Sequence, residues 1–102
     1  MRTYSTPEFN EWLSRLDAKA RVQVDDRLDR IREYDHFGDK KHLNDELFEL
    51  RWTSGRRVYY SKVRDKAGNL ALLLMGGGKS GQKKDIKKAR RILEREAPSA
   101  GP

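Results

Sequence analysis

Apolar residues recur at helical spacing through the first third of the chain. One stripe repeats at i, i+3, i+4 and i+7 and consists of Phe9, Trp12, Leu13 and Leu16. Residues 5–8, STPE, precede it and have the features of a helix start: a hydroxyl N-cap, a proline in the first turn and a glutamate that reaches back. A second stripe follows Asp17, which can cap a helix, and consists of Ala20, Val24, Leu28 and Ile31. The pattern predicts a short extended segment at residues 1–5 and then an α-hairpin.

The apolar period changes to that of a strand in the middle of the chain. Residues 35–45 contain Gly38, both histidines and no period, so we expect a loop there. Residues 47–52 alternate like a half-buried strand, with Glu49 and Arg51 on one face and Phe48, Leu50 and Trp52 on the other. After a turn at residues 53–55, residues 57–63 continue the alternation. Residues 70–75 are apolar on both faces, which predicts a central strand covered on both sides.

The last predicted element is a basic helix after a glycine-rich segment at residues 76–82. Its narrow apolar seam consists of Ile86, Ala89 and Leu93. The order β-α-α-β-β-β-α, with three strands in an antiparallel meander, predicts an α+β fold in which the α-hairpin covers one sheet face. We expect the other face to be partly polar and to carry Arg51 and Arg57. Residues 1–96 should form one domain, and residues 97–102, with nothing to pack against, should fray.

Composition limits the classes of protein that this chain can be. Its 102 residues suit one modest core, and the absence of cysteine excludes disulfides and thiolate metal sites and fits a reducing cytosol. The longest apolar run is far shorter than the roughly 20 residues that span a bilayer, so we expect a cytoplasmic protein. The net charge is −3 for residues 1–50 and +10 for residues 51–102, which gives the total of +7. A basic half of this kind favours a polyanion as partner, and the alternative is a solvated basic surface.

The glycine-rich segment is the most distinctive local feature. It leaves a buried strand and enters a helix with Lys79 and Ser80 at the junction. Glycines let backbone N–H groups approach a phosphate, and a helix N-terminus and a lysine both favour an anion. The segment is not a Walker A loop, because Leu73 stands where that motif needs a glycine. A plain connection between strand and helix is the alternative interpretation.

Arg51 and Arg57 fall on facing strands across a tight turn. Two neighbouring guanidiniums repel each other unless an anion lies between them, so we expect a nucleic-acid phosphate there. The alternative is a pair of arginines that face solvent. The same choice applies to the basic face of the last helix, which is formed by Lys83, Lys84, Lys87, Lys88, Arg90 and Arg91. The two histidines have no further ligand at metal-binding spacing, so neither a metal ion nor another cofactor is expected.

Three separated motifs resemble the HigB-like killer proteins of addiction modules, in the RelE/ParE toxin superfamily. The group's pattern runs roughly ELR, then GYRVYF, then LLLxGGDKSxQxxDIxxA. This chain has ELR at residues 49–51, RVYY at residues 57–60 and LLLMGGGKS at residues 72–80, followed by Gln82, Asp85 and Ile86. The opening STPEFNEWLSRL and the FGDKK segment are also similar, so the resemblance covers about residues 3–96. It is specific, because the motifs agree in order and spacing.

The resemblance implies a toxin that cuts mRNA in the ribosomal A site and is silenced by a cognate antitoxin. Carried over to this chain, Arg51 and Arg57 would hold the scissile phosphate, and Lys79 would supply further charge or a proton. Such cleavage needs the 2′-hydroxyl deprotonated, the phosphorane charge stabilised and the leaving oxygen protonated. We expect the phosphate or RNA contacts around this centre to come from Tyr59, Ser80, Gln82, Lys83 and Lys84.

The chain departs from the group's pattern at three positions. Gly78 stands where the group has Asp, Arg56 replaces the Tyr before the strand arginine, and no Tyr follows Met75. Two other functions are therefore kept beside mRNA cleavage: a ParE-like toxin that poisons DNA gyrase by binding, and a noncatalytic nucleic-acid-binding member. Either toxin would pair with a small antitoxin, expected to carry a DNA-binding helix-turn-helix and to cover the basic face with carboxylates.

Overall fold

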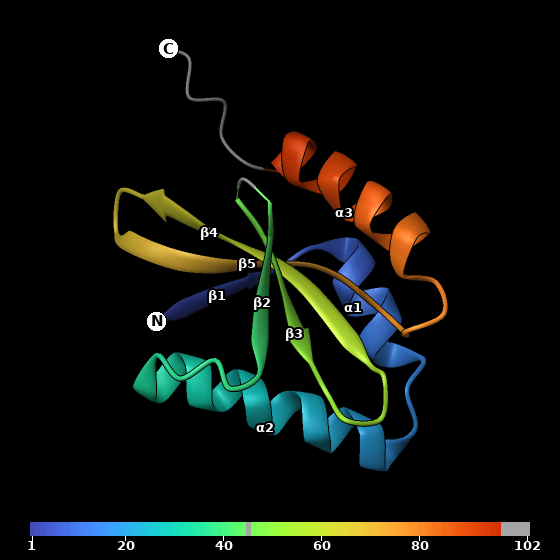
Figure 1. Ribbon diagram of the computed structural model, residues 1–102. Helices are drawn as coiled ribbons and strands as arrows, with labels where there is room; N and C mark the ends of the chain where they lie inside the picture. The colour runs from blue at the N-terminus through green and yellow to red at the C-terminus, as the bar shows by residue number, and fades with distance from the viewer. Residues whose placement is uncertain (45, 97–102) are drawn as a thin grey trace.

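The computed structural model describes residues 1–44 and 46–96, and these form one five-stranded sheet with helices on both faces (Figure 1). The strands lie in the order β1-β5-β4-β3-β2. Along the chain the elements are β1 (Arg2–Ser5), α1 (Pro7–Ser14), α2 (Ala18–Tyr34), β2 (Lys40–Asn44), β3 (Leu47–Arg51), β4 (Arg57–Asp65), β5 (Gly68–Gly77) and α3 (Gln82–Glu96). The predicted α+β fold is confirmed. Within the described ranges, no helix is both long enough and apolar enough to cross a membrane.

Side-chain caps start the first two helices where the sequence predicts them. Thr6 is the N-cap of α1, and its Oγ1 accepts a hydrogen bond from the N–H of Phe9 at 3.1 Å. Asp17 is the N-cap of α2 and accepts from the N–H of Ala20 at 2.8 Å. Each cap satisfies an N–H group that the helix leaves without an internal partner. The α-hairpin therefore follows from the polar residues at its corners as well as from its apolar stripes.

The central strand β5 contains a bulge that sets which residues face each helix layer. Tyr59 of β4 pairs with Met75, but the next residue, Tyr60, pairs with Leu73, so Leu74 has no partner in β4. Leu74 and Met75 consequently pack on the same side of the sheet. The bulge is fastened to the first helix, because Thr6 donates its hydroxyl to the carbonyl of Leu74 at 2.6 Å and its N–H to that of Leu73 at 3.1 Å. Bulges of this type redirect the side chains that follow them.

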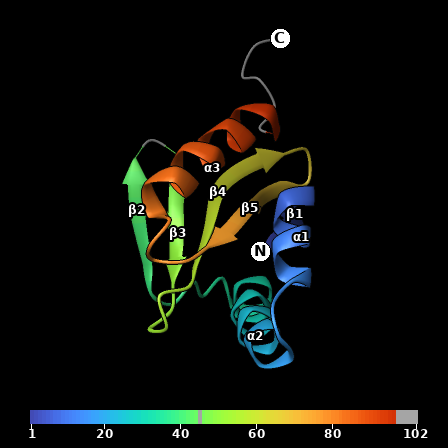
Figure 2. The same cartoon turned by 90° about the vertical axis from the view of Figure 1, so that its right-hand side faces the viewer.

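Two apolar clusters fill the two sides of the sheet. The helices α2 and α3 lie at opposite ends of the view in Figure 2, because they cover opposite faces. The α-hairpin side contains Phe9, Val24, Leu28, Ile31, Phe37, Leu50, Val58, Tyr60, Ala71 and Leu73. The α3 side contains Leu47, Tyr59, Leu70, Leu72, Leu74, Met75, Ala89 and Ile92. The α-hairpin covers one face as predicted. The second face is more apolar than predicted, because α3 packs over it along Ala89 and Ile92, and the arginines are confined to one end.

The predicted loop at residues 35–45 is wrong in its second half. Lys40–Asn44 form the edge strand β2, which pairs antiparallel with β3 through Lys40↔Leu50 and His42↔Phe48. All of its residues except the half-buried Leu43 are exposed. An edge strand held by backbone hydrogen bonds buries too little for an alternating pattern to show. Residue 45 and the predicted frayed tail at residues 97–102 lie outside the described residues.

A bidentate ion pair joins the first helix to the end of the last. Arg95 Nη1 and Nη2 lie 2.6 Å and 2.7 Å from the two carboxylate oxygens of Glu8. The hydrogen bond from Arg95 lowers the pKa of Glu8 from its ordinary value of 4.5 to about 2. Because a lowered pKa means that folding favours the charged form, the pair stabilises the fold above the unfolded-state pKa, and this stabilisation is lost as the pH falls towards 2.

We therefore expect Glu8→Gln to destabilise the protein at pH 7 by about 1 kcal/mol, the upper end for a solvent-accessible pair, which is appropriate for bidentate geometry. The difference from wild type should shrink steadily below pH 4.5, where the unfolded chain binds the proton first. Urea unfolding between pH 7 and pH 3 measures it. Glu11→Gln is the control, since the Glu11–Arg15 pair is exposed within a single helix. An equal loss at both ends of the pH range would contradict this account.

Candidate functional site

The predicted catalytic residues meet at one end of the sheet, where the β3–β4 turn lies beside the β5–α3 loop. Arg51 is directly opposite Arg57 in the β3–β4 register, and Arg57 is opposite Gly77 of β5. Lys79 reaches the same place from the loop, because a Cβ built on Gly55 of the turn would lie 3.4 Å from the Lys79 Cβ. Strand register and the loop path thus bring three cationic residues from separate parts of the sequence to the same end of the sheet.

The two arginines are in different environments. The Arg51 side chain is 40% exposed, whereas that of Arg57 is 7% exposed. Arg57 Nη1 donates to the carbonyl of Arg56 at 3.2 Å and to that of Trp52 at 3.5 Å. This guanidinium therefore stabilises the β3–β4 turn. The predicted open pair of arginines is corrected: only Arg51 presents its guanidinium to solvent.

The anion between the arginines belongs to the protein. Glu49 is fully buried, and its Oε1 lies 3.7 Å from Arg57 Nε and 3.9 Å from Arg51 Nε. Gln82, in the first turn of α3, donates its amide to both carboxylate oxygens, at 3.2 Å and 3.1 Å. Sequence reasoning expected RNA phosphate in this position and Gln82 on the RNA. It missed the carboxylate because strand alternation placed Glu49 on an open face, and the coverage by α3 could not be read from the pattern.

Tyr59 is placed where it cannot contact RNA in this conformation. The side chain is fully buried in the cluster under α3, and its hydroxyl has no hydrogen-bond partner among residues 1–44 and 46–96. Burial, followed by the charges of Glu49 and Asp85, raises the pKa of Tyr59 to about 12. The phenol is therefore protonated at any physiological pH. The predicted phosphate contact by Tyr59 does not agree with this geometry.

The glycine-rich loop is held tightly at two positions and is open at the third. A Cβ on Gly76 would lie 2.2 Å from the Trp12 ring, and one on Gly77 would lie 2.1 Å from Asp85 Oδ2. Gly78 has open space where a side chain would be. Of the residues after it that were predicted to contact phosphate, Lys79, Ser80, Lys83 and Lys84 are exposed, and Gln82 is half-buried. A depression of about 630 Å³ lies between this loop and the β3–β4 turn, with Trp12 in its wall.

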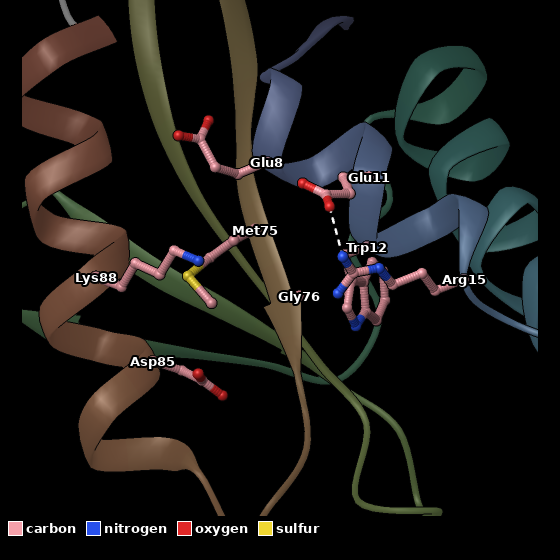
Figure 3. Close-up of a pocket in the computed structure, with 8 residues that line it drawn as sticks. All are labelled: Glu8, Glu11, Trp12, Arg15, Met75, Gly76, Asp85 and Lys88. Carbon is pink, nitrogen blue, oxygen red and sulfur yellow. Dashed lines mark hydrogen bonds and ion pairs between the residues drawn. The ribbon is translucent and has the colours of Figure 1, made fainter.

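A smaller pocket of about 200 Å³ lies on the other side of Trp12, between α1 and α3 (Figure 3). Its polar lining is mainly acidic and comprises Glu8, Glu11, Asp85, Arg15 and Lys88. Burial raises the pKa of Asp85, the carboxylate that contacts the glycine loop. Sequence reasoning assigned Trp12 to the core; it is half-buried and separates a basic depression from an acidic one. No cluster of three or more metal-ligating His, Cys, Asp or Glu side chains occurs in the described part of the chain.

Arg27 of α2 supports the site from the opposite face and was also missed. Its guanidinium stacks on the Trp52 ring, 4.4 Å from the centroid, and donates to the carbonyl of Arg51 at 2.9 Å. Burial lowers the pKa of Arg27. The contact fixes the backbone where β3 ends and thereby the position from which Arg51 projects. In the sequence, Arg27 is one of several charged residues on the outer face of a helix, and nothing distinguishes it.

Alanine substitutions in the glycine loop test its packing. We expect Gly76→Ala to lower the free energy of unfolding by about 2 kcal/mol, because the new methyl group must displace the Trp12 ring. Gly78→Ala is the matched control and should leave stability unchanged or raise it by about 0.5 kcal/mol, since the position is open and its φ is not positive. Chemical denaturation measures both. Equal effects at the two positions would show that the loop is not held against Trp12.

Substitution of Arg57 should lower the free energy of unfolding more than substitution of Arg51. Arg57→Gln removes the buried partner of a buried carboxylate, so we expect a loss of about 3 kcal/mol. Arg51→Gln changes a side chain that is 40% exposed and should cost less than about 1 kcal/mol. If the two substitutions destabilise the fold equally, the assigned difference between the two arginines is incorrect.

Comparison with known proteins places the chain in a family and identifies its fold. The family described as phage-derived protein Gp49-like matches residues 11–96. A protein of Haemophilus influenzae, described as uncharacterized, is 40% identical over 93 residues, which is 88% of this chain and 90% of that protein.

Two solved structures share the fold at low sequence identity. The toxin–antitoxin complex RelBE2 of Mycobacterium tuberculosis matches with a TM-score of 0.58 and 18% identity, over 76% of this chain and 95% of that one. The isolated RelE toxin of E. coli also matches with a TM-score of 0.58, at 14% identity, over 90% of this chain and 98% of that one. The fold is therefore of the RelE type, as the sequence motifs predicted.

Proposed function

The chain belongs to the phage-derived Gp49-like protein family, and from this membership and its RelE-type fold we propose that it is the toxin of a type II toxin–antitoxin pair, of the HigB-like group, which cleaves mRNA on the ribosome. The observation that carries the proposal is that Arg51 ends β3 at the same end of the sheet where Lys79 lies against the β3–β4 turn, next to the open position at Gly78. RNA cleavage places extra negative charge on the scissile phosphate, and preformed cations at that point lower the barrier.

The proposal gives the cationic residues different tasks. Arg51 and Lys79 contact the scissile phosphate, since both side chains reach solvent. Arg57 is buried behind Arg51, where it pairs with Glu49 and holds the β3–β4 turn. Its guanidinium would have to leave Glu49 to contact phosphate. Ser80, Lys83 and Lys84 contact neighbouring phosphates along the first turn of α3. No tyrosine is assigned as acid or base, because Tyr59 and Tyr60 are fully buried, and burial raises the pKa of each to about 12.

The basic surface also fits a protein partner. The exposed lysines and arginines of α3 offer an acidic antitoxin segment many charge-assisted contacts. A segment that covered Lys79 and Arg51 would block phosphate by occupying the same cations. We therefore propose a cytoplasmic complex with a small antitoxin in which the toxin site is covered.

A toxin that poisons DNA gyrase by binding is the second candidate. It is favoured by the burial of Tyr59 and Tyr60 on the two faces of the sheet, since a binding surface needs cations but no acid or base. The two candidates differ in what happens to mRNA, and the test measures this directly.

The test is induction of the wild type, Arg51→Gln and Arg64→Gln in a bacterial host, with mapping of mRNA 5′ ends on translated and untranslated messages. Arg64 is a matched control, because it is an exposed arginine at the other end of the β4–β5 hairpin, paired with Asn69. We expect new 5′ ends on translated messages only, reduced about a hundredfold by Arg51→Gln and unchanged by Arg64→Gln. Growth arrest with intact mRNA and trapped gyrase–DNA complexes would favour the second candidate. Unimpaired growth with folded wild-type protein present would exclude both.

A further inference from the structure

We propose that Glu49 is the positioning residue of this site. Its buried carboxylate orients the guanidiniums of Arg51 and Arg57, and its hydrogen bonds from Gln82 link both arginines to α3. The inference about RNA rests on the proposed function, whereas the inference about the arginines concerns the fold alone. Glu49 belongs to the ELR motif, but neither the sequence pattern nor the proposed chemistry gives it a task.

Glu49 offsets the repulsion between the two arginines. Arg51 and Arg57 are cross-strand neighbours, and like charges in directly opposite positions destabilise a sheet. Glu49 is two residues before Arg51 on the same strand face and diagonal to Arg57, and its Oε1 is within 3.9 Å of both Nε atoms. With one negative and two positive charges, the cluster keeps a net charge of +1. The two arginines can therefore lie side by side in the free protein, and the remaining positive charge of the cluster is left to bind a phosphate of RNA.

Glu49 also faces the inner side of both guanidiniums. The Nε atoms of both arginines are buried and have no hydrogen-bond partner within residues 1–44 and 46–96, so the carboxylate is the charge that they face. Arg57 uses Nη1 on the turn carbonyls. Arg51 has no such contact for its terminal nitrogens among the same residues, and its side chain is 40% exposed. Glu49 thus faces the buried Nε of Arg51 and leaves its terminal nitrogens to bind phosphate. An arginine can donate two parallel hydrogen bonds to a phosphate group.

Gln82 links Glu49 to α3. Its two contacts to Glu49, at 3.2 Å and 3.1 Å, run from the first turn of α3 to the middle of β3. Lys79 and Ser80 lie immediately before this turn, so the contacts fix the loop that carries Lys79 relative to the strand that carries Arg51. A single buried carboxylate therefore sets the spacing between the two proposed phosphate contacts.

This arrangement predicts opposite effects on binding and on cleavage. Glu49→Gln removes a negative charge close to the phosphate site, so RNA should bind two- to tenfold more tightly. It also removes the charge that orients both arginines, so the rate of cleavage by bound toxin should fall at least tenfold. A residue that only supported the fold would lower the folded fraction and would not tighten binding. Glu94→Gln makes the same change in net charge at an exposed position of α3 and is the matched control.

The experiment has two readouts. Binding of a fluorescent single-stranded RNA and cleavage of mRNA programmed on purified ribosomes are measured for wild type, Glu49→Gln and Glu94→Gln. Independently, NMR of the arginine Nε–H groups in the free proteins reports their exchange with solvent. We expect slow exchange at Arg51 and Arg57 in wild type and Glu94→Gln, and fast exchange at both in Glu49→Gln.

Each outcome decides the inference. Tighter binding, slower cleavage and fast exchange in Glu49→Gln support it, while slow exchange retained in Glu49→Gln overturns it. If wild type binds RNA but does not cut it, the proposed function fails and the NMR comparison alone decides the role of Glu49. If Glu49→Gln does not fold, the double variant Glu49→Gln with Arg57→Gln removes the unbalanced buried charge. Arg51 should then exchange fast, and slow exchange at Arg51 in that variant overturns the inference.

Discussion

The strand β5 passes between Trp12 of α1 and Asp85 of α3 with no room for a Cβ at Gly76 or Gly77. The helices α1 and α3 cover opposite faces of the sheet, so the end of β5 is confined from both sides. Its path is therefore fixed only when both helices are packed. The bulge at Leu74 makes this path possible, since it turns a glycine towards Trp12. Thr6 fastens the bulge and caps α1 with the same hydroxyl. The shape of the loop that carries Lys79 therefore depends on packing on both sides of the sheet.

Charge at the site is organised in two layers. The buried layer contains Glu49, Arg57 and the Gln82 amide: Glu49 is ion-paired with Arg57 and accepts hydrogen bonds from Gln82, and Arg57 donates to the carbonyls of the β3–β4 turn. The outer layer contains Arg51 and the exposed lysines, whose charge is available to an anion. A buried ion pair adds little net stability when its desolvation is counted, but removal of one member leaves an expensive uncompensated charge. Under the proposed function, the buried layer thus fixes the geometry of the site, and the outer layer supplies the affinity for phosphate.

The sequence predicted the elements whose signals are local. A hydroxyl cap before Pro7, the cap at Asp17 and the apolar strand β5 each depend on residues within one turn or one strand, and all three are confirmed. The first helix is shorter than its stripe predicted, because α1 ends at Ser14 and Leu16 lies beyond it, and Glu8 pairs with Arg95. The strand β2 was missed, because an exposed edge strand depends on backbone pairing with β3. Tyr59, Gln82 and Arg57 were placed on the open surface, because alternation along a strand cannot show that α3 covers the second face. The neighbouring positions of Arg51 and Arg57 followed from the tight turn between their strands, whereas the place of Lys79 beside them was implied only by the resemblance to the HigB-like group.

The open position at Gly78 bears on how such a site would cut RNA. The HigB-like group carries an aspartate there, and the space beside Gly78 would admit one without a clash. Its absence leaves Lys79 and Arg51 without a neighbouring surface carboxylate at that point of the loop, which strengthens their hold on a phosphate. The same absence removes a group that could accept the proton of the 2′-hydroxyl. With Tyr59 and Tyr60 buried and protonated, the site is better equipped to stabilise charge than to move protons. Under the proposed function, Arg51 and Lys79 therefore act on the charge of the phosphate, and no side chain of the described site is assigned as acid or base.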